Sequence, residues 1–256
     1  MISKFQDLKN KNVIVTGGSG FIGKQICTAF LSQGSNVYVF DLKTLKSKKK
    51  IKYLKTDITN SQELENNLNF FKKKKIKLDI LINNAANDYV PNNKNRNEFK
   101  LENFSNNLWD KDLNTGLKGS YLCTKIFGSY MARNKGGVIL NVASDLGIIA
   151  PNQDLYSKSK FTKPITYSVV KHGLIGLTKY TASYWAKKKI RCNAIAPGGM
   201  FNNQSRNFLN KINKIIPLGR MAKKNEYDDL ILFLCSEASS YMTGSVVVAD
   251  GGRTII

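Results

Sequence analysis

The residues best suited to chemistry in this chain are Tyr167 and Lys171, four positions apart, together with Ser144 upstream. On a helix, this spacing places the tyrosine and the lysine on one face. A tyrosine phenol has an ordinary pKa of about 10, and a neighbouring ammonium group favours its ionised form and lowers that pKa. The pair would therefore exchange a proton with an alcohol oxygen, to which the Ser144 hydroxyl would donate a hydrogen bond.

A glycine-rich segment comes directly after the first apolar run of the chain. Gly18, Gly20 and Gly23 have the G-x-G-x-x-G spacing of a dinucleotide-binding turn. Glycines permit a tight turn and a close approach of the backbone to a pyrophosphate, which rests on the N-terminus of the next helix. The whole segment is predicted to bind the cofactor: Gly17, Gly18, Ser19, Gly20, Phe21, Ile22 and Gly23.

Asp41 ends the second apolar run of the chain. A carboxylate there accepts hydrogen bonds from a ribose 2′-hydroxyl and repels a 2′-phosphate, so the predicted cofactor is NAD rather than NADP. Lys43 and Lys46 lie close by and keep NADP open as an alternative. Asp57, in Thr56-Asp57-Ile58, either contacts the adenine edge or caps a helix.

These residues need a scaffold, and the apolar pattern supplies one. Apolar residues repeat at helical spacing between Ile22 and Phe30 and between Leu174 and Trp185. Short apolar runs rich in β-branched residues are predicted to be strands: Val13–Thr16, Val37–Phe40, Ile80–Ile82, Val138–Val142, Ile190–Ile195 and Val246–Val248. This alternation indicates an α/β, doubly wound Rossmann fold, in which a parallel sheet carries helices on both faces.

The length of 256 residues fits a single domain covering residues 1–256. The Asn- and Lys-rich stretch from Asn87 to Asn97 is expected to be an exposed loop. No run of eighteen apolar residues and no apolar signal core is present, so neither a membrane span nor a secretory signal is expected. The four cysteines are widely spaced and form neither a disulfide framework nor a metal motif, which is typical of a reducing cytoplasm.

The formal net charge of +22 invites a nucleic-acid or membrane partner. Only six of the forty basic residues are arginine, however, and the lysine runs at 48–50 and 72–75 are interpreted as solvated faces. We therefore expect a small-molecule substrate and neither nucleic acid nor membrane. Attraction for a phosphorylated or carboxylated substrate stays open.

Together these motifs resemble the short-chain dehydrogenase/reductase family in its compact single-domain form. The likeness covers nearly the whole chain and includes these further segments: Asn83–Ala86, Leu113–Gly116, Asn193–Gly198, Thr243–Gly244 and Asp250–Gly252. The resemblance implies hydride transfer between a nicotinamide and a secondary alcohol carbon, with NAD or NADP as cofactor. It also implies a homo-tetramer or homo-dimer.

The resemblance implies a role for each matching residue. Tyr167 would be the acid/base, and Lys171 would bind the nicotinamide ribose and depress the pKa of the tyrosine. Ser144 would polarise the carbonyl, and Asn114 would hold a water in a proton relay to Lys171. Other residues would line the cofactor groove: Asp57, Ile58, Asn84, Ala85, Ala86, Pro197 and Gly198. A loop at about 145–166 and a lid at about 199–225 would enclose the substrate.

Three features depart from the family pattern. Phe21 stands where compact members usually carry glycine, a spacing more typical of the longer sugar-nucleotide epimerases and dehydratases. Those carry a separate substrate domain, for which 256 residues leave little room. Ala86 replaces the usual glycine, and the gap from Ser144 to Tyr167 is longer than usual.

The longer gap contains a second Tyr-x-x-x-Lys, formed by Tyr156 and Lys160. A helix running on from Lys160 would meet Pro164, which costs about 3 kcal/mol in a helix interior, so Tyr167 is the predicted acid/base. The segment 152–164 would then be an extra loop beside the substrate, where Tyr156 either contacts the substrate or packs. The candidate substrate-binding residues are Ser144, Asp145, Asn152, Tyr156, Tyr167, Gly199 and Met200. For Asp145, a capping or turn role is equally open.

The inserted loop and the amide-rich lid resemble a subgroup found in bacterial surface-sugar gene clusters, whose members make or modify nonulosonic acids and amino sugars. The favoured substrate is therefore a sugar, a sugar phosphate or a nucleotide sugar. One alternative is a 3-oxoacyl thioester (acyl-carrier-protein) reductase that uses NADPH. An alternative of another class is a non-catalytic nucleotide-binding module.

Overall fold

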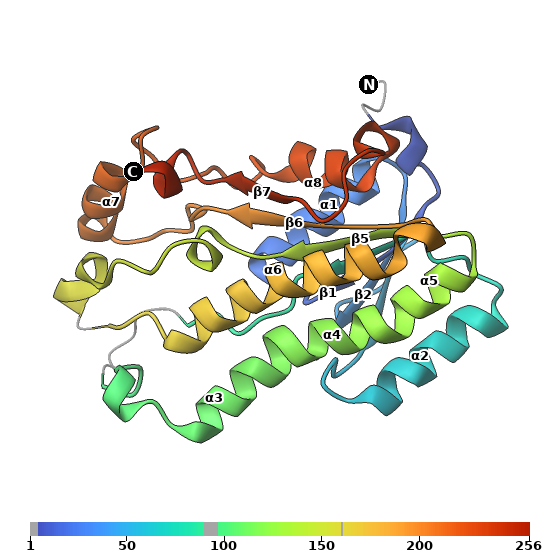
Figure 1. Cartoon of the computed structure of the whole chain (residues 1–256), viewed down its shortest axis with the longest axis horizontal. Helices are drawn as coiled ribbons and strands as arrows, with labels where there is room; N and C mark the ends of the chain where they lie inside the picture. Colours follow the sequence, from blue (N-terminus) through green and yellow to red (C-terminus); the bar gives the residue numbers. More distant parts are fainter. Residues whose placement is uncertain (1–4, 90–96, 160) are drawn as a thin grey trace.

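A computed structural model describes residues 5–89, 97–159 and 161–256 (Figure 1). Its strands form one seven-stranded sheet in the order β3-β2-β1-β4-β5-β6-β7, in which every neighbouring pair is parallel. The bounds are β1 Asn12–Thr16, β2 Asn36–Asp41, β3 Ile51–Lys55, β4 Ile80–Asn83, β5 Gly137–Val142, β6 Ile190–Pro197 and β7 Val246–Ala249. The predicted doubly wound Rossmann fold is confirmed, and the order reverses beside β1, where such folds bind their ligands.

Helices cover both faces of this sheet (Figure 1). Their bounds are α1 Phe21–Ser32, α2 Ser61–Lys73, α3 Asn106–Leu113, α4 Gly119–Cys123, α5 Ser129–Arg133, α6 Ile165–Trp185, α7 Arg206–Ile212 and α8 Asp228–Cys235. The helices α3, α4 and α5 follow one another through two π-helical turns, Asn114–Lys118 and Thr124–Gly128. A π-turn of this kind inside a helix is frequent at functional sites.

Alternate residues of β1 point to opposite faces of the sheet and belong to two separate hydrophobic cores. Val13 and Val15 pack with Phe30 of α1 and Ile231 of α8, whereas Ile14 points to the opposite face, toward the cluster that contains Phe127. All three β1 residues are fully buried, as expected for a strand covered on both sides. Burying each such side chain contributes about 1.5–3 kcal/mol to folding.

The strand β3 was not among the predicted strands. Its sequence, Ile-Lys-Tyr-Leu-Lys, leaves Lys52 and Lys55 exposed, because β3 lies at the edge of the sheet and only Ile51 is buried. An edge strand lacks the continuous apolar run of the central parallel strands. The helix predicted to run from Tyr167 through Trp185 is confirmed as α6, which begins two residues earlier at Ile165 with Pro164 as its N-cap.

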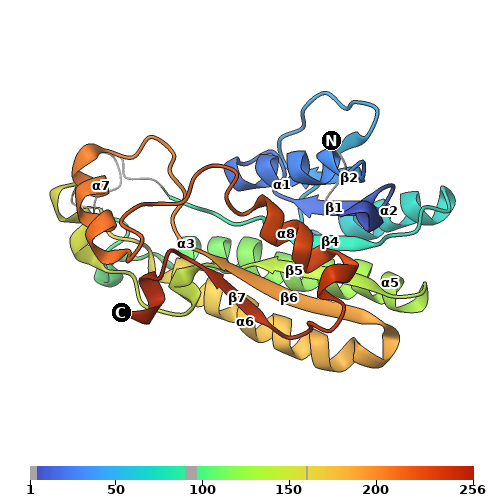
Figure 2. The same ribbon diagram turned by 90° about the horizontal axis from the view of Figure 1, so that it is seen from above.

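The carboxyl ends of the strands point toward one end of the molecule, where the lid and the inserted loop lie. Figures 1 and 2 both place α7 of the lid beside the segment Gln153–Ser159, with the C-terminal end of the chain at the same end. Most of the predicted loop 87–97 (residues 90–96) lies outside the described residues, as does Lys160 of the second motif. No helix in the described ranges is both long and apolar enough to cross a bilayer.

Candidate active site

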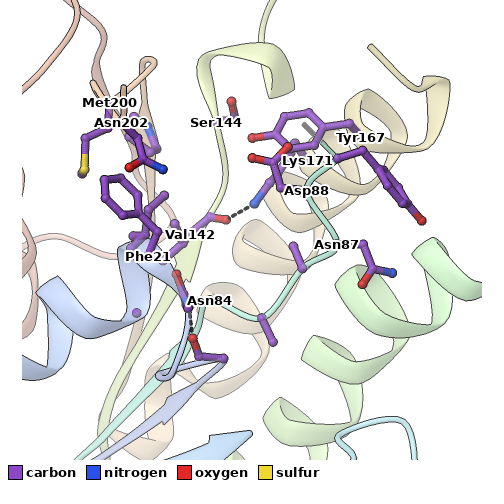
Figure 3. A pocket seen from close by; sticks show the side chains of 18 of the residues that line it. Phe21, Asn84, Asn87, Asp88, Val142, Ser144, Tyr167, Lys171, Met200 and Asn202 are labelled. Carbon is purple, nitrogen blue, oxygen red and sulfur yellow. Dashed lines mark hydrogen bonds between the residues drawn. The ribbon is translucent and has the colours of Figure 1, made fainter. Parts of the chain in front are cut away.

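A cavity of about 1460 Å³ runs along the carboxyl ends of the strands. It exceeds the roughly 300–1,000 Å³ of an ordinary small-molecule site, as a site for a dinucleotide and a substrate must. The glycine turn and Asp41 line one part of it, and Ser144, Tyr167 and Lys171 line another. Figure 3 shows Ser144, Lys171 and Asp88 around Tyr167.

Lys171 lies one turn after Tyr167 on α6 and is only 5% exposed. Its Nζ donates a 2.7 Å hydrogen bond to the carbonyl of Val142 at the end of β5 (Figure 3) and lies 5.6 Å from the centroid of the Tyr167 ring. Burial lowers the pKa of Lys171 to about 8, against an opposing effect of the Asp88 carboxylate. The ammonium is therefore held close to its titration range at neutral pH.

The electrostatics of Tyr167 differ from the sequence prediction. Burial raises the pKa of its phenol above the ordinary value, and the Asp88 carboxylate raises it further. A hydrogen bond with Ser144 lowers that pKa, but not enough to offset burial. The predicted depression of the pKa is therefore wrong for this structure, because desolvation outweighs the ammonium, which is directed at the Val142 carbonyl.

Ser144 follows β5 and caps the short helical turn Asp145–Gly147. Its Oγ accepts a hydrogen bond from the Leu146 N–H (3.2 Å) and donates one to Oδ1 of Asp145 (2.8 Å). The turn is pressed against α6, since a Cβ on Gly147 would overlap the backbone of Lys171. This contact sets Ser144 beside the tyrosine–lysine pair.

Asp145 lines the cavity, and both of its carboxylate oxygens accept hydrogen bonds within the protein. Asp145 is 3% exposed, and its Oδ1 accepts hydrogen bonds from the Ser144 hydroxyl and from the Leu146 N–H. Its Oδ2 accepts a 2.7 Å hydrogen bond from the buried guanidinium of Arg253. The turn role that the sequence left open is observed, and the predicted substrate contact of Asp145 stays a prediction.

The glycine turn has the geometry that a dinucleotide requires. Gly17 has φ +65° and packs so closely on Ala85 that a Cβ would overlap it, and a Cβ on Gly23 would overlap the Gly17 carbonyl. Gly20 is the N-cap of α1, and no described side chain caps the N–H groups there. Ser19, Phe21 and Ile22 line the cavity, whereas Gly18 lies beneath the turn against Val39.

Side chains at the ends of β1, β2 and β4 hold this turn in place. Asn84 Nδ2 donates to the Thr16 carbonyl (2.9 Å) and the Gly17 carbonyl (3.2 Å). Asp41 accepts from the N–H groups of Ser19 and Lys43, each at 2.9 Å. The residues predicted for the cofactor therefore fix the turn through their own hydrogen bonds, and they also line the cavity.

Asp57 and Ile58 follow β3 and line the same part of the cavity as Asp41. Asp57 Oδ1 accepts from the N–H (2.9 Å) and the hydroxyl (2.8 Å) of Thr59. The cap of α2 is instead Asn60, so the alternative role of Asp57 as a helix cap is wrong.

The remaining predicted cofactor residues lie at the ends of β4 and β6 and on the helix after α3. Ala85, Ala86 and Pro197 line the cavity, as do Gly198, Gly199 and Met200 at the start of the lid. Asn114 also lines it and opens the π-helical turn Asn114–Lys118. This turn approaches α6 closely, because a Cβ on Gly116 would overlap Val170.

Asn152 and Tyr156, both on the inserted loop, lie differently with respect to the cavity. Asn152 is exposed and is not among the residues that line the cavity, and its Oδ1 accepts from the N–H of Asp154 (2.9 Å). The structure therefore does not bring Asn152 to the predicted substrate site. Tyr156 lines the cavity and packs between the rings of Phe161 (5.3 Å between centroids) and Phe208 (5.5 Å).

Sequence reasoning missed four charged residues that line the cavity: Asp88, Lys111, Lys163 and Arg253. Lys163 Nζ lies 2.6 Å from Asp88 Oδ1 and 3.8 Å from the centroid of the Tyr167 ring. Lys163 directly precedes Pro164, and this position beside a helix start was a usable signal. Arg253 follows the Asp250-Gly251-Gly252 segment by one position, but no local pattern marks it as buried.

Residues 19–254 match a family described as enoyl-(acyl carrier protein) reductase. Among curated proteins, the NAD-dependent glycerol dehydrogenase of Listeria innocua is 30% identical and the alignment covers 97% of this chain and 96% of that protein. The 3-oxoacyl-[acyl-carrier-protein] reductase FabG of Thermotoga maritima is also 30% identical, over 97% of this chain and 99% of its own length.

Solved structures show the same fold. A short chain dehydrogenase from Leptospira borgpetersenii with bound NAD+ superposes with a TM-score of 0.86 at 30% identity, covering 96% of this chain and 93% of that one. The aldohexose dehydrogenase of Thermoplasma acidophilum superposes with a TM-score of 0.83 at 27% identity, covering 98% and 97%.

Proposed function

Because the chain belongs to the short-chain dehydrogenase/reductase family, whose members oxidise or reduce CH–OH groups with NAD or NADP, we propose that it interconverts a secondary alcohol of a sugar and the corresponding ketone with NAD. The observation that carries this proposal is the grouping of Ser144, Tyr167 and Lys171 in one cavity with the glycine turn. A module that only bound nucleotides would have no use for that grouping.

The cofactor fits the cavity beside the glycine turn, where Gly17, Gly20 and Gly23 line the space and carry no side chains to fill it. Gly17–Gly23, Asp41, Asp57, Asn84 and Pro197–Gly198 would hold it. Once bound, it supplies the acceptor for the hydride that leaves the alcohol carbon. Asp41 favours NAD, since its carboxylate would repel a 2′-phosphate. The NAD dependence of the Listeria relative and the NAD+ bound to the Leptospira structure support this choice.

The chain's own residues would move the proton. Tyr167 would take the hydroxyl proton as the C–H hydride departs, in an ionised form that burial disfavours and that a neighbouring cation must favour. It would return the proton in the reverse direction. Ser144 would hold the substrate oxygen beside the phenol. Lys171, with a pKa of about 8, would supply positive charge and pass the proton onward, with Asn114 ordering a water beside it. Low dielectric around these buried groups strengthens each interaction.

The lid and the inserted loop support a sugar substrate. Amide side chains suited to hydroxyl groups line the cavity at Asn202, Asn203, Gln204 and Asn207. The aldohexose dehydrogenase is a sugar enzyme of the same fold. Lys163 lies beside the Tyr167 ring, but it is paired with Asp88 at 2.6 Å and so does not by itself favour a phosphate or carboxylate on the sugar.

The second candidate function is reduction of a 3-oxoacyl thioester with NADPH. The similarity to the Thermotoga FabG protein favours it, at the same identity as the glycerol dehydrogenase. Asp41 and the polar lid weigh against it, because they disfavour the extra phosphate of NADPH and an acyl chain respectively.

We also propose a homo-dimer or homo-tetramer in the cytoplasm. Three tyrosines on α4 and α6 are exposed in the single chain: Tyr121 (47%), Tyr180 (67%) and Tyr184 (65%). Tyrosines are enriched in protein interfaces, so this face would contact a second copy. The four cysteines are free and buried, which fits a reducing compartment.

The test is nicotinamide-linked turnover of NAD(H) and NADP(H) over nucleotide sugars, hexose phosphates, free sugars and 3-oxoacyl thioesters. We expect NADH-linked turnover of a sugar, lost by about 10²-fold or more in Tyr167→Phe. The fully exposed Tyr241→Phe is the matched control and should behave as the parent. NADPH-linked thioester reduction would establish the second candidate instead, and full activity of Tyr167→Phe would contradict the mechanism.

A further inference from the structure

A buried ion pair joins the C-terminal region to the reacting residues. Arg253 Nη1 donates to Asp145 Oδ2 at 2.7 Å across 108 residues of sequence. The two side chains are 8% and 4% exposed. Arg253 Nε is buried without a hydrogen-bond partner among the described residues.

Such a pair is costly to bury. Removing two charges from water carries a desolvation cost that their attraction repays only with good geometry and full hydrogen bonding. The unpartnered Nε means that the hydrogen bonding of Arg253 is incomplete. Stability alone is therefore a weak explanation for this pair, and the hydrogen bond between Asp145 and Ser144 gives a better one.

The second contact of the Asp145 carboxylate is with Ser144. While Oδ2 of Asp145 accepts from Arg253, Oδ1 accepts the Ser144 hydroxyl at 2.8 Å. A guanidinium, a carboxylate and a hydroxyl thus form one hydrogen-bonded series ending beside Tyr167. Ser144 has a single O–H proton, so this hydrogen bond competes with donation to a substrate oxygen. The guanidinium withdraws charge from the carboxylate and weakens its hold on that proton.

The carboxylate also lies close enough to oppose negative charge on Tyr167. Burial, Asp88 and Asp145 all raise the pKa of the Tyr167 phenol. Without a cation beside it, Asp145 would oppose both the phenolate and the developing alkoxide more strongly. The other charged or titratable groups around the phenol are Tyr156, Lys163 and Lys171.

We propose that Arg253 is a positioning residue for the reaction, which acts through Asp145 to weaken the hold of the carboxylate on the Ser144 hydroxyl and to neutralise the carboxylate beside Tyr167. This inference rests on the proposed roles of Ser144 and Tyr167. Asp145 is correspondingly the link between Arg253 and Ser144.

The test measures the pH dependence of alcohol oxidation with the substrate found in the panel. Arg253→Gln leaves the Asp145 charge without its cation. The ionised phenol then forms at higher pH, and the midpoint of the rising limb should move up by about one pH unit. Asp145→Asn removes the opposing charge, so its midpoint should move down. The double variant Asp145→Asn/Arg253→Gln should return to the midpoint of the parent.

Rates and controls complete the test. Loss of a charge-assisted hydrogen bond of this kind should lower kcat of Arg253→Gln roughly tenfold, with the KM for NAD unchanged. Arg253→Lys keeps the charge and should keep the midpoint. Opposite shifts that cancel in the double variant are not expected of a purely structural contact, for which all midpoints would coincide.

Coincident midpoints in Arg253→Gln, Asp145→Asn and the parent would overturn the inference, whether or not the rates fall. If Arg253→Gln does not fold, Asp145→Asn and the double variant decide on the same criterion. Tyr167→Phe separates the two proposals. Full activity of that variant removes the proposed function, whereas an inactive Tyr167→Phe with coincident midpoints removes only the role of Arg253.

Discussion

At the scale of single residues, burial in the folded chain disfavours the positively charged form of Lys171. Its pKa falls from 10.5 in an ordinary environment to about 8 in the folded chain, because the side chain is buried. The unfolded chain therefore binds more protons between these two values, and stability rises with pH across that window. Below pH 8 the full cost of burying the ammonium is present.

Lys171→Met should abolish activity and stabilise the fold at neutral pH. Removing the buried charge gains about 3 kcal/mol from the pKa difference, less about 1 kcal/mol for the lost hydrogen bond to the Val142 carbonyl. The gain should shrink as pH rises from 8 toward 10.5. Chemical unfolding at a series of pH values measures it.

The control for that experiment is Lys179→Met, on the same helix but exposed. It should show no pH-dependent gain over the parent. A Lys171→Met protein less stable than the parent at pH 7 would show that the ammonium is stabilising where it lies.

Three arginines of this chain form several specific hydrogen bonds each or a buried ion pair, and the sequence did not predict the role of Arg253. Arg191 donates to three carbonyl groups, Arg220 forms a two-point contact with Glu226, and Arg253 holds Asp145. A planar guanidinium suits such contacts better than an ammonium. The scarcity of arginine was read only as a sign against nucleic acid. The partners of Arg253 depend on tertiary contacts that no local spacing reveals.

At the scale of elements, the site depends on the close approach of α6 to the helix that carries Asn114. Glycine permits this approach, since Gly116 has no room for a Cβ beside Val170. The sequence predicted α6 well, because Pro164 and the helical spacing mark its start. It did not predict the π-helical turn at Asn114, because the packing of Gly116 on Val170 and the inward position of Asn114 are tertiary features.

Gly116→Ala should push the two helices apart and displace Asn114. Overpacking of this kind costs about 1–3 kcal/mol, and activity should fall further than stability explains, because the relay residue moves. Thermal unfolding and kcat together measure the two effects.

Gly176→Ala on α6 is the matched control, because a Cβ there meets no atom within 4 Å. It should stabilise the helix by up to about 1 kcal/mol and leave kcat unchanged. Equal behaviour of the two alanine variants would contradict the close-packing argument.

At the scale of the whole molecule, the existence of the apolar strands could be predicted more fully than their order in the sheet or the polar edge strand β3. The six predicted apolar runs were all found, and most residues of β1, β4, β5 and β6 are buried. The edge strand β7 was found through its continuous apolar run, although none of its residues is fully buried. The edge strand β3 was missed, since only one of its five residues is buried. Sequence spacing predicted the glycine turn, Ser144, Tyr167 and Lys171. It could not predict that Lys163 and Arg253 line the cavity, because their positions depend on tertiary structure.

The exposed tyrosines of α6 lead to a prediction about assembly. Tyr180 and Tyr184 stack with a 5.8 Å centroid separation on the surface of the single chain. Replacing both with glutamate should leave the fold intact, because neither belongs to the core, and should shift the protein to a smaller species. Light scattering with size-exclusion chromatography reports the mass, and circular dichroism reports the fold.

The control is Tyr241→Glu, which changes a fully exposed tyrosine outside α6 and should keep the parent's mass. A parent that is already monomeric, or a double variant of unchanged mass, would contradict an interface on this face.

The residues that line the cavity fall into two groups along the sequence. The groups placed to hold a dinucleotide come from residues 17–86 and 197–198, while those that would meet a substrate come mainly from residues 144–167 and 199–253. Segments exchanged between relatives would therefore carry different properties with them. A recombinant that kept the first 140 residues of this chain and took the remainder from a homologue should inherit its cofactor preference from one parent and its substrate range from the other. Gene shuffling gives this architecture a short route to new substrates.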